Sequence, residues 1–123
     1  MAKGIPGIIL FTQTGRMSSG LKVLLKSLFP LADIEQTEDP NVLKGSLNTN
    51  SPRVVLIDVA LPGGQGWITA REVQQKFPLH HPILLTHQLR ENDQAETAGL
   101  QSLLLEGMTA DSLSDTLVPF LQS

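Results

Sequence analysis

The sequence predicts an α/β fold in which a doubly wound, five-stranded parallel sheet has helices on both faces. Short apolar segments alternate five times with segments of helical periodicity. Four of the five strand segments are apolar throughout rather than at every second position, which indicates strands buried on both faces. With 123 residues, 41% of them hydrophobic, the chain is expected to form one domain, a three-layer sandwich over residues 1–123.

Five strands are expected where apolar or β-branched runs are bounded by turn residues. In chain order they lie at 7–11, 31–36, 54–57, 83–85 and 103–105. Five helices are expected after them, because apolar residues recur every three or four positions and capping or helix-stopping residues flank these segments. In chain order they lie from Ser18 or Ser19 to Pro30, at about 40–47, 67–76 and 91–98, and from Thr109 onwards.

Composition and charge exclude several classes of protein. Twelve acidic against nine basic residues give a net charge of −3, which argues against a nucleic-acid-binding protein. The chain has no cysteine, and therefore no disulfide, no thiolate nucleophile and no cysteine-bound zinc. No apolar run is long enough to span a bilayer, and the start does not resemble a signal peptide. We therefore expect a cytoplasmic protein that does not bind membranes.

Polar side chains follow four of the predicted strands. Thr12 and Gln13 come after the first strand, Asp58 ends the third, Thr86 the fourth and Glu106 the fifth. In open parallel sheets, ligands bind beyond the carboxyl ends of the strands. These five side chains are therefore expected to lie close together and to form the candidate functional pocket.

The segment LIDVALPGGQG, from Leu56 to Gly66, resembles the phosphoacceptor segment of bacterial response-regulator receiver domains. In that family an aspartate ends the third strand, Leu-Pro follows, and a glycine opens the next helix. ILLT at 83–86 resembles the fourth strand with its switch hydroxyl, and AGL at 98–100 resembles the segment before the fifth strand. The resemblance covers nearly the whole chain. It implies a flavodoxin-like (βα)5 fold, a role in two-component (phosphorelay) signalling, and Asp58 as the phosphoacceptor equivalent.

The chain also departs from the family pattern at the pocket. Thr12 and Gln13 stand where the family has two acidic residues that hold Mg²⁺ together with the acceptor aspartate. Glu106 stands where the family has a lysine. The aromatic switch residue of the family's fifth strand would fall near the position of Leu103. Mg²⁺ sites in proteins depend on carboxylates, and a carboxylate repels a phosphoryl group that a lysine would attract. We therefore expect a degenerate pseudo-receiver with no metal and no cofactor. It would not be an enzyme, and it would act through protein–protein contacts without Mg²⁺-dependent phosphorylation.

The resemblance further implies where a partner binds. Receiver domains commonly use the face formed by the fourth helix, the fifth strand and the fifth helix, here roughly 91–121. Leu103, Leu113 and Leu117 are the candidate contact residues of this face. The partner is expected to be a protein: a histidine kinase, an output domain, or a second copy of the chain in a homodimer.

Two other functions stay open at this point. In the first, the chain is a working phospho-receiver in which Asp58 takes a phosphoryl group from a histidine kinase with Mg²⁺ as cofactor. In the second, the sequence from Thr12 to Gly15 resembles the phosphate loop of flavodoxins and binds a flavin or another anion. A flavin needs aromatic walls for its ring system, and only 4% of the residues are aromatic.

Other basic residues near the pocket have alternative roles. Arg16 is expected either to pair with Asp58 or Glu106 in place of a metal, or to be an exposed arginine at a helix start. His87 is expected either beside Asp58 at the rim of the pocket or as a surface imidazole. The pair His80-His81 is expected to lie in a loop exposed to solvent.

Overall fold

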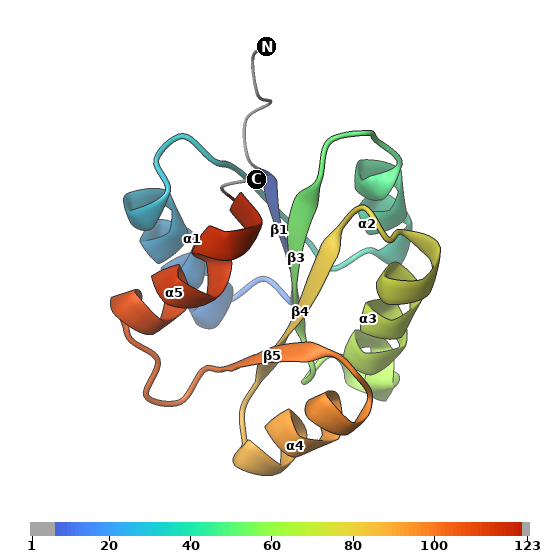
Figure 1. Ribbon diagram of the computed structural model, residues 1–123. Coiled ribbons are helices and arrows are strands. Elements are labelled where there is room, and N and C mark those ends of the chain that lie inside the picture. Colours follow the sequence, from blue (N-terminus) through green and yellow to red (C-terminus); the bar gives the residue numbers. More distant parts are fainter. Residues whose placement is uncertain (1–6, 122–123) are drawn as a thin grey trace.

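The computed structural model describes residues 7–121, which form one parallel five-stranded sheet between two layers of helices (Figure 1). The strands are β1 (Gly7–Phe11), β2 (Asp33–Thr37), β3 (Arg53–Asp58), β4 (His81–Thr86) and β5 (Gln101–Leu104). They pair in the order β2-β1-β3-β4-β5, so the chain reverses its direction of winding between β1 and β3. The predicted fold class is therefore confirmed, and the expected ligand-binding edge lies where β1 and β3 end.

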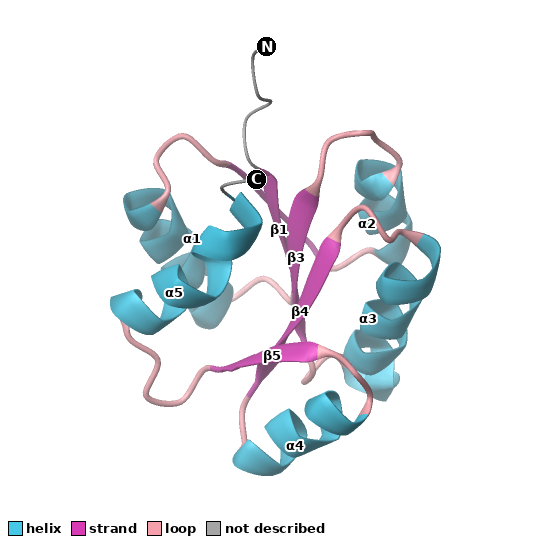
Figure 2. Cartoon of the chain, viewed as in Figure 1, coloured by secondary structure: helices cyan, strands magenta, loops and turns pink. Residues whose placement is uncertain are grey.

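The helices are divided between the two faces of the sheet (Figure 2). One face is covered by α1 (Arg16–Leu28) and α5 (Ala110–Leu121). The other is covered by α2 (Pro40–Leu47), α3 (Gln65–Lys76) and α4 (Leu89–Thr97). A 3₁₀ turn, η1 (Pro62–Gly64), precedes α3. Within residues 7–121, no helix is both long enough and apolar enough to cross a membrane.

The central strands are buried on both sides, which explains their continuous apolar sequences. Successive side chains of a strand point to opposite faces, so each strand contributes to two separate apolar layers. Side chains facing α2, α3 and α4 include Ile9, Phe11, Val55, Ile57 and Leu84. Side chains facing α1 and α5 include Ile8, Leu10, Val54, Leu56, Ile83 and Leu85.

Three leucines that the sequence suggested as partner contacts lie inside the second of these layers. Leu103 is 7% exposed, and Leu113 and Leu117 are fully buried. The prediction that they contact a partner is wrong, because the apolar stripe of α5 packs against the sheet instead of facing solvent. Any partner surface on this side of the molecule is formed by the outward-facing residues of the same elements.

The first helix begins earlier than its sequence suggested. The N-cap of α1 is Gly15, so neither Ser18 nor Ser19 caps the helix. Ser18 lies inside the first turn, where its hydroxyl accepts the N–H of Gly15 and lies 3.0 Å from the carbonyl oxygen of the same residue. A serine at this position can close the helix start from within, which is why it resembled a cap in the sequence.

The loop after β3 is shaped by glycines. Gly63 and Gly64 both have φ near 70°, a conformation that residues with a side chain adopt less readily. Gly66, in the first turn of α3, lies so close to β3 that a Cβ atom there would be 2.2 Å from the carbonyl oxygen of Asp58. The glycines therefore let α3 begin directly against the end of β3, which fixes the backbone around Asp58.

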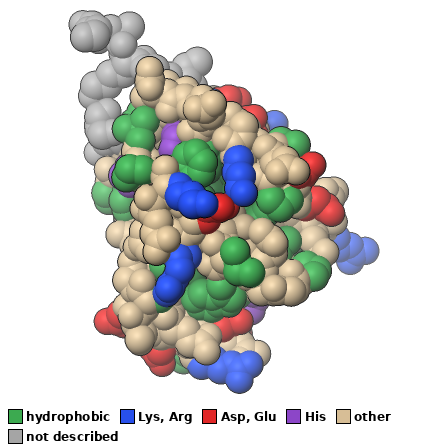
Figure 3. Space-filling view, turned by 90° about the vertical axis from the view of Figure 1, so that its right-hand side faces the viewer, with side chains coloured by type: hydrophobic (Ala, Val, Ile, Leu, Met, Phe, Trp, Pro, Cys, Tyr) green, Lys and Arg blue, Asp and Glu red, His purple; other side chains and the backbone are tan. Residues whose placement is uncertain are grey.

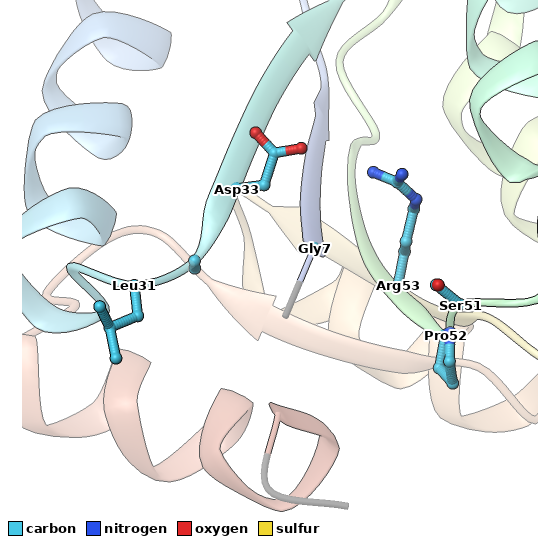
Figure 4. Close-up of a pocket in the computed structure, with 7 residues that line it drawn as sticks. Gly7, Leu31, Asp33, Ser51, Pro52 and Arg53 are labelled. Atoms are coloured by element: carbon cyan, nitrogen blue, oxygen red, sulfur yellow. The ribbon is translucent and has the colours of Figure 1, made fainter. Parts of the chain in front are cut away.

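An ion pair at the opposite edge of the sheet crosses a strand. Arg53 of β3 reaches over β1 to Glu35 of β2, with 2.8 Å between Nη1 and Oε2. Gly7 leaves the room for this, since a Cβ there would lie 3.0 Å from Cγ of Arg53. Figure 4 shows Arg53 and Asp33 on either side of the strand that begins at Gly7. Gly7, Asp33 and Arg53 are among the residues that line an open cavity of about 480 Å³, far from Asp58 along the strands.

The buried position of His80 corrects a prediction. Its side chain is 3% exposed, whereas the sequence suggested a solvated loop residue. The ring lies between the start of β3 and the end of α2, with Nδ1 at 3.0 Å from the N–H of Arg53 and Nε2 at 2.7 Å from the carbonyl oxygen of Leu47. Two main-chain partners thus hold His80 in the interior, although the turn-like sequence around it predicts an exposed residue.

One ion pair connects α2 with α3, and a second lies within α3. Lys44 of α2 lies 3.2 Å from Glu72 of α3, and Lys76 lies 3.4 Å from the same carboxylate. The hydrogen bond from Lys44 lowers the pKa of Glu72 below its usual value. Figure 3 shows the face on this side of the molecule, where basic side chains gather next to acidic ones. Exposed pairs of this kind contribute little stability each, about 0.5 kcal/mol.

Candidate functional site

The carboxyl edge of the sheet brings Asp58 and Thr12 together, as predicted. Asp58 is the last residue of β3, and Thr12 follows β1, the neighbouring strand. The hydroxyl of Thr12 donates a hydrogen bond of 3.0 Å to Oδ2 of Asp58. Both residues are buried, with 1% of Thr12 and 7% of Asp58 exposed. The carboxylate therefore depends on the protein, and not on water, for most of its hydrogen bonds.

The loop after β3 supplies a second donor. The main-chain N–H of Ala60 donates to Oδ1 of Asp58 at 2.8 Å, and the N–H of Leu61 donates to the main-chain oxygen of Asp58 at 3.3 Å. An aspartate whose side chain accepts the N–H two residues later is a common way to start a turn. Ala60 was not among the residues expected in the pocket, although an aspartate just before a Pro-Gly loop is a signal for this bond.

The third donor is His87, which lies between β4 and α4. Its Nε2 is 2.8 Å from Oδ1 of Asp58. Its main-chain N–H donates to Oε1 of Glu91 at 2.7 Å, which fixes the residue to the first turn of α4. Of the two roles that the sequence left open for His87, the structure shows the position beside Asp58.

Thr86 points toward α4 and β5. It is fully buried, its hydroxyl donates to the side-chain oxygen of Asn92 in α4, and the carbonyl oxygen of Leu103 in β5 is 3.3 Å away. Within the described residues it makes no hydrogen bond with Asp58. Thr86 therefore connects β4, α4 and β5 beside the pocket, without contacting the carboxylate at its centre.

Three other predicted pocket residues are exposed. Gln13, Arg16 and Glu106 all lie on the surface, and within residues 7–121 none of them makes a hydrogen bond or ion pair with Asp58. Of the two roles left open for Arg16, the structure supports the exposed arginine at the start of α1. The pocket around Asp58 is therefore formed by Thr12, Ala60 and His87.

These residues do not fit a magnesium ion. Both oxygens of Asp58 already accept hydrogen bonds, from the Thr12 hydroxyl and from the Ala60 and His87 nitrogens. Across residues 7–121, no three His, Cys, Asp or Glu side chains come close enough to share a metal ion. Mg²⁺ requires nearly octahedral oxygen ligands, typically with one or two carboxylates free to bind.

In the loop that resembles the flavodoxin phosphate loop, two main-chain N–H groups already donate hydrogen bonds to side chains of this protein. The N–H of Thr14 donates to Oε2 of Glu38 at 3.2 Å, and the N–H of Gly15 donates to the hydroxyl of Ser18 at 3.0 Å. A phosphate would need such N–H groups to be free at the start of the helix. The negative charge of the Glu38 carboxylate next to the loop would also repel a bound anion.

Comparisons with known proteins give a result only for structure. No family model matches the chain, and no curated protein sequence matches it. The signal receiver domain of a DNA-binding response regulator from Colwellia psychrerythraea 34H is similar with a TM-score of 0.76 at 18% identity, over 98% of this chain and 100% of that one. The chain has the fold of a response-regulator receiver domain.

The receiver fold recurs in the other similar structures. A CheY-like response-regulator receiver domain protein from Methanospirillum hungatei JF-1 has a TM-score of 0.70 at 15% identity, over 97% of this chain and 96% of that one. A structure described as adenylate cyclase from Rhodopirellula baltica has a TM-score of 0.72 at 15% identity, over 96% and 87% of the two chains. The predicted resemblance to receiver domains is confirmed for the fold, and the fold occurs in proteins with different names and functions.

Proposed function

We propose that the chain is a single receiver-like domain of a two-component signalling system that acts through protein–protein contacts. It is cytoplasmic, it catalyses no reaction, and it does not depend on Mg²⁺ or on phosphorylation of Asp58. The observation that carries the proposal is the state of the Asp58 carboxylate, which is buried and bonded to three donors of its own chain.

The charges around the pocket support this proposal. Phosphoryl transfer requires the charge on the moving group to be neutralised, chiefly by metal ions and cationic side chains. Thr12 and Gln13 are neutral, and Glu106 adds a negative charge near the end of β5. Arg16, which follows the loop after β1, is exposed and makes no ion pair with Asp58 in the described structure. A phosphoryl group on Asp58 would therefore meet no compensating charge from these positions.

The surface of α4, β5 and α5 is the proposed partner site. Residues 89–121, which span these three elements, carry six acidic side chains and one basic side chain, that of Arg90. In a homodimer with two-fold symmetry this surface would face its own copy, so that like charges meet across the interface. We therefore infer a protein partner with a basic surface, from a kinase or an output domain, rather than a second copy of this chain.

Incubation with a small phosphodonor tests the proposal. We expect no mass increase on Asp58 when the protein is incubated with acetyl phosphate or beryllofluoride and Mg²⁺. We also expect no change in the fluorescence of Trp67, a residue of α3 that packs against the apolar layer between this helix and the sheet. The physical reason is that, within the described residues, the carboxylate has no metal site and no Lys or Arg side chain pairs with it.

A variant with the family pattern is the positive control. Thr12→Asp, Gln13→Asp and Glu106→Lys together put the two acidic residues and the lysine back. This variant should respond to Mg²⁺ and beryllofluoride under the same conditions. An adduct on Asp58 of the unaltered chain would overturn the proposal and favour the alternative, a working phospho-receiver supplied by a histidine kinase.

A further inference from the structure

His87 is attached to the molecule at two points. Its main chain is bonded to Glu91 in the first turn of α4, and its ring is bonded to Asp58 at the end of β3. An ionised carboxylate can only accept hydrogen bonds, so Nε2 of His87 carries the proton that it shares with Oδ1. The side chain thus forms a direct connection between Asp58 and the start of α4.

His87 differs from the other two groups, Thr12 and Ala60, that donate hydrogen bonds to Asp58. Thr12 is 1% exposed and Ala60 donates through its main chain, so neither can leave without rearranging the sheet edge or the loop. The side chain of His87 is 39% exposed, and its main-chain bond to Glu91 does not depend on the ring. The imidazole can therefore leave Asp58 by rotation of its own side chain.

We propose that the imidazole of His87 is an autoinhibitory contact that closes Asp58 and couples this carboxylate to the start of α4. This inference rests on the proposed function, since it describes what occupies the acceptor position of a receiver that needs no metal. A partner that draws the ring away from Asp58 uncovers the carboxylate and breaks the link between the end of β3 and the first turn of α4.

Chemical labelling of carboxyl groups tests the contact. The protein is treated at neutral pH with a carbodiimide and glycinamide, and the extent of modification at each carboxylate is measured by peptide mass spectrometry. In His87→Ala, labelling of Asp58 is expected to increase severalfold over the unaltered protein. Labelling of Asp93 and Asp111, which are exposed in both proteins, should not change. Equal labelling of Asp58 with and without His87 would overturn the proposal.

Two further variants distinguish protection of Asp58 by the hydrogen bond from His87 from protection by the bulk of a side chain. His87→Gln places an amide nitrogen the same number of bonds from Cβ as Nε2, so it should keep Asp58 protected. Leu89→Ala changes a neighbouring side chain that is 69% exposed and not bonded to Asp58 in the described structure, and it should behave as the unaltered protein. If His87→Gln were labelled as strongly as His87→Ala, the hydrogen bond would not be the cause of protection, and the proposal would fail.

Hydrogen exchange gives a second readout for the coupling to α4. The N–H of Glu91 donates to the carbonyl oxygen of Gln88 at 3.0 Å. This N–H should exchange faster in His87→Ala than in His87→Gln, and equal rates would contradict the coupling. The proposed function is tested separately, because beryllofluoride uptake by the unaltered protein overturns it whatever the labelling shows.

Discussion

Among single residues, His80 shows how the fold selects one form of an imidazole. Nδ1 accepts the N–H of Arg53, so Nε2 carries the ring proton and donates to the carbonyl oxygen of Leu47. A second ring proton would meet the N–H of Arg53 and break that bond. Burial lowers the pKa of His80 below its usual value of 6.5, although the bond to Leu47 acts in the opposite direction.

The free energy of unfolding should therefore decrease in acid because of His80. The pKa is lower in the folded than in the unfolded chain, so the unfolded chain takes up the proton first as the pH falls. The stability that His80 contributes is complete above the unfolded pKa of about 6.5 and is lost below it. Urea unfolding at several pH values on both sides of 6.5 measures this loss.

One variant isolates the contribution of His80 from other titrating groups. His80→Gln can still donate to Leu47 but does not titrate, so its unfolding free energy should depend less on pH in this range than that of the unaltered protein. The same pH dependence in His80→Gln and in the unaltered protein would show that His80 plays no part.

At the candidate site, the sequence identified residues better than it identified contacts. Asp58 and Thr12 could be predicted because both end neighbouring strands, and parallel strands end at one edge. For His87 the sequence left two positions open, because the direction of a side chain just beyond a strand depends on the path of the following loop. For the same reason Glu106 was expected in the pocket, whereas the chain turns after β5 and leaves it exposed.

At the scale of elements, the start of α3 is the most constrained junction. The N-terminal turn of α3 touches the main chain of β3, and a Cβ atom at Gly66 would also lie 2.9 Å from the carbonyl carbon of Asp58. Gly66→Ala should therefore destabilise the protein by about 2 kcal/mol, the cost of forcing extra volume into a packed site. Urea unfolding measures this change.

Gly20 provides the matched control, because it is also a helical glycine. Nothing lies within 4 Å of a Cβ atom built at Gly20 in α1. Gly20→Ala should stabilise the protein by about 1 kcal/mol, since alanine favours the helix and restricts the unfolded chain. If the two substitutions changed the free energy of unfolding in the same direction, the close approach of α3 to Asp58 would not explain the need for glycine at position 66.

The same elements show which parts of the fold the sequence predicts. Short apolar runs such as 54–57 predict their strands well, because they are rich in β-branched residues, are bounded by turn residues and are too short for a buried helix. Helix starts are less certain, as Ser18 shows, since a hydroxyl bonds similarly from the cap and from inside the first turn. Apolar helix residues such as Leu113 identify a helix face, but whether that face meets the sheet or a partner depends on tertiary packing.

At the scale of the molecule, charge is unevenly distributed along the chain. Residues 89–121, from α4 to α5, carry six acidic side chains and one basic side chain, whereas α1 carries Arg16, Lys22 and Lys26 and no acidic residue. We therefore expect no self-association through α4, β5 and α5 at low ionic strength, where repulsion acts over roughly 30 Å at 0.01 M salt. Sedimentation equilibrium at low salt should show a monomer.

Cross-linking identifies the surface if association occurs. A dimer at low salt with cross-links mapped to residues 91–121 would contradict the inferred preference for a basic partner. Replacing Asp111 and Asp115 on the outer side of α5 by lysine mixes the charges of this surface. The charge-mixed variant should then associate more readily than the unaltered chain, because opposite charges meet across the two-fold axis.

The strand order leaves β2 and β5 at the two margins of the sheet. A marginal strand offers free main-chain groups to any other extended peptide, and long, flat, apolar margins lead to aggregation. Here β2 contains Asp33 and Glu35 within five residues, and β5 is only four residues long. Both margins are thus poor templates for fibril growth, so concentrated solutions of this protein should stay clear.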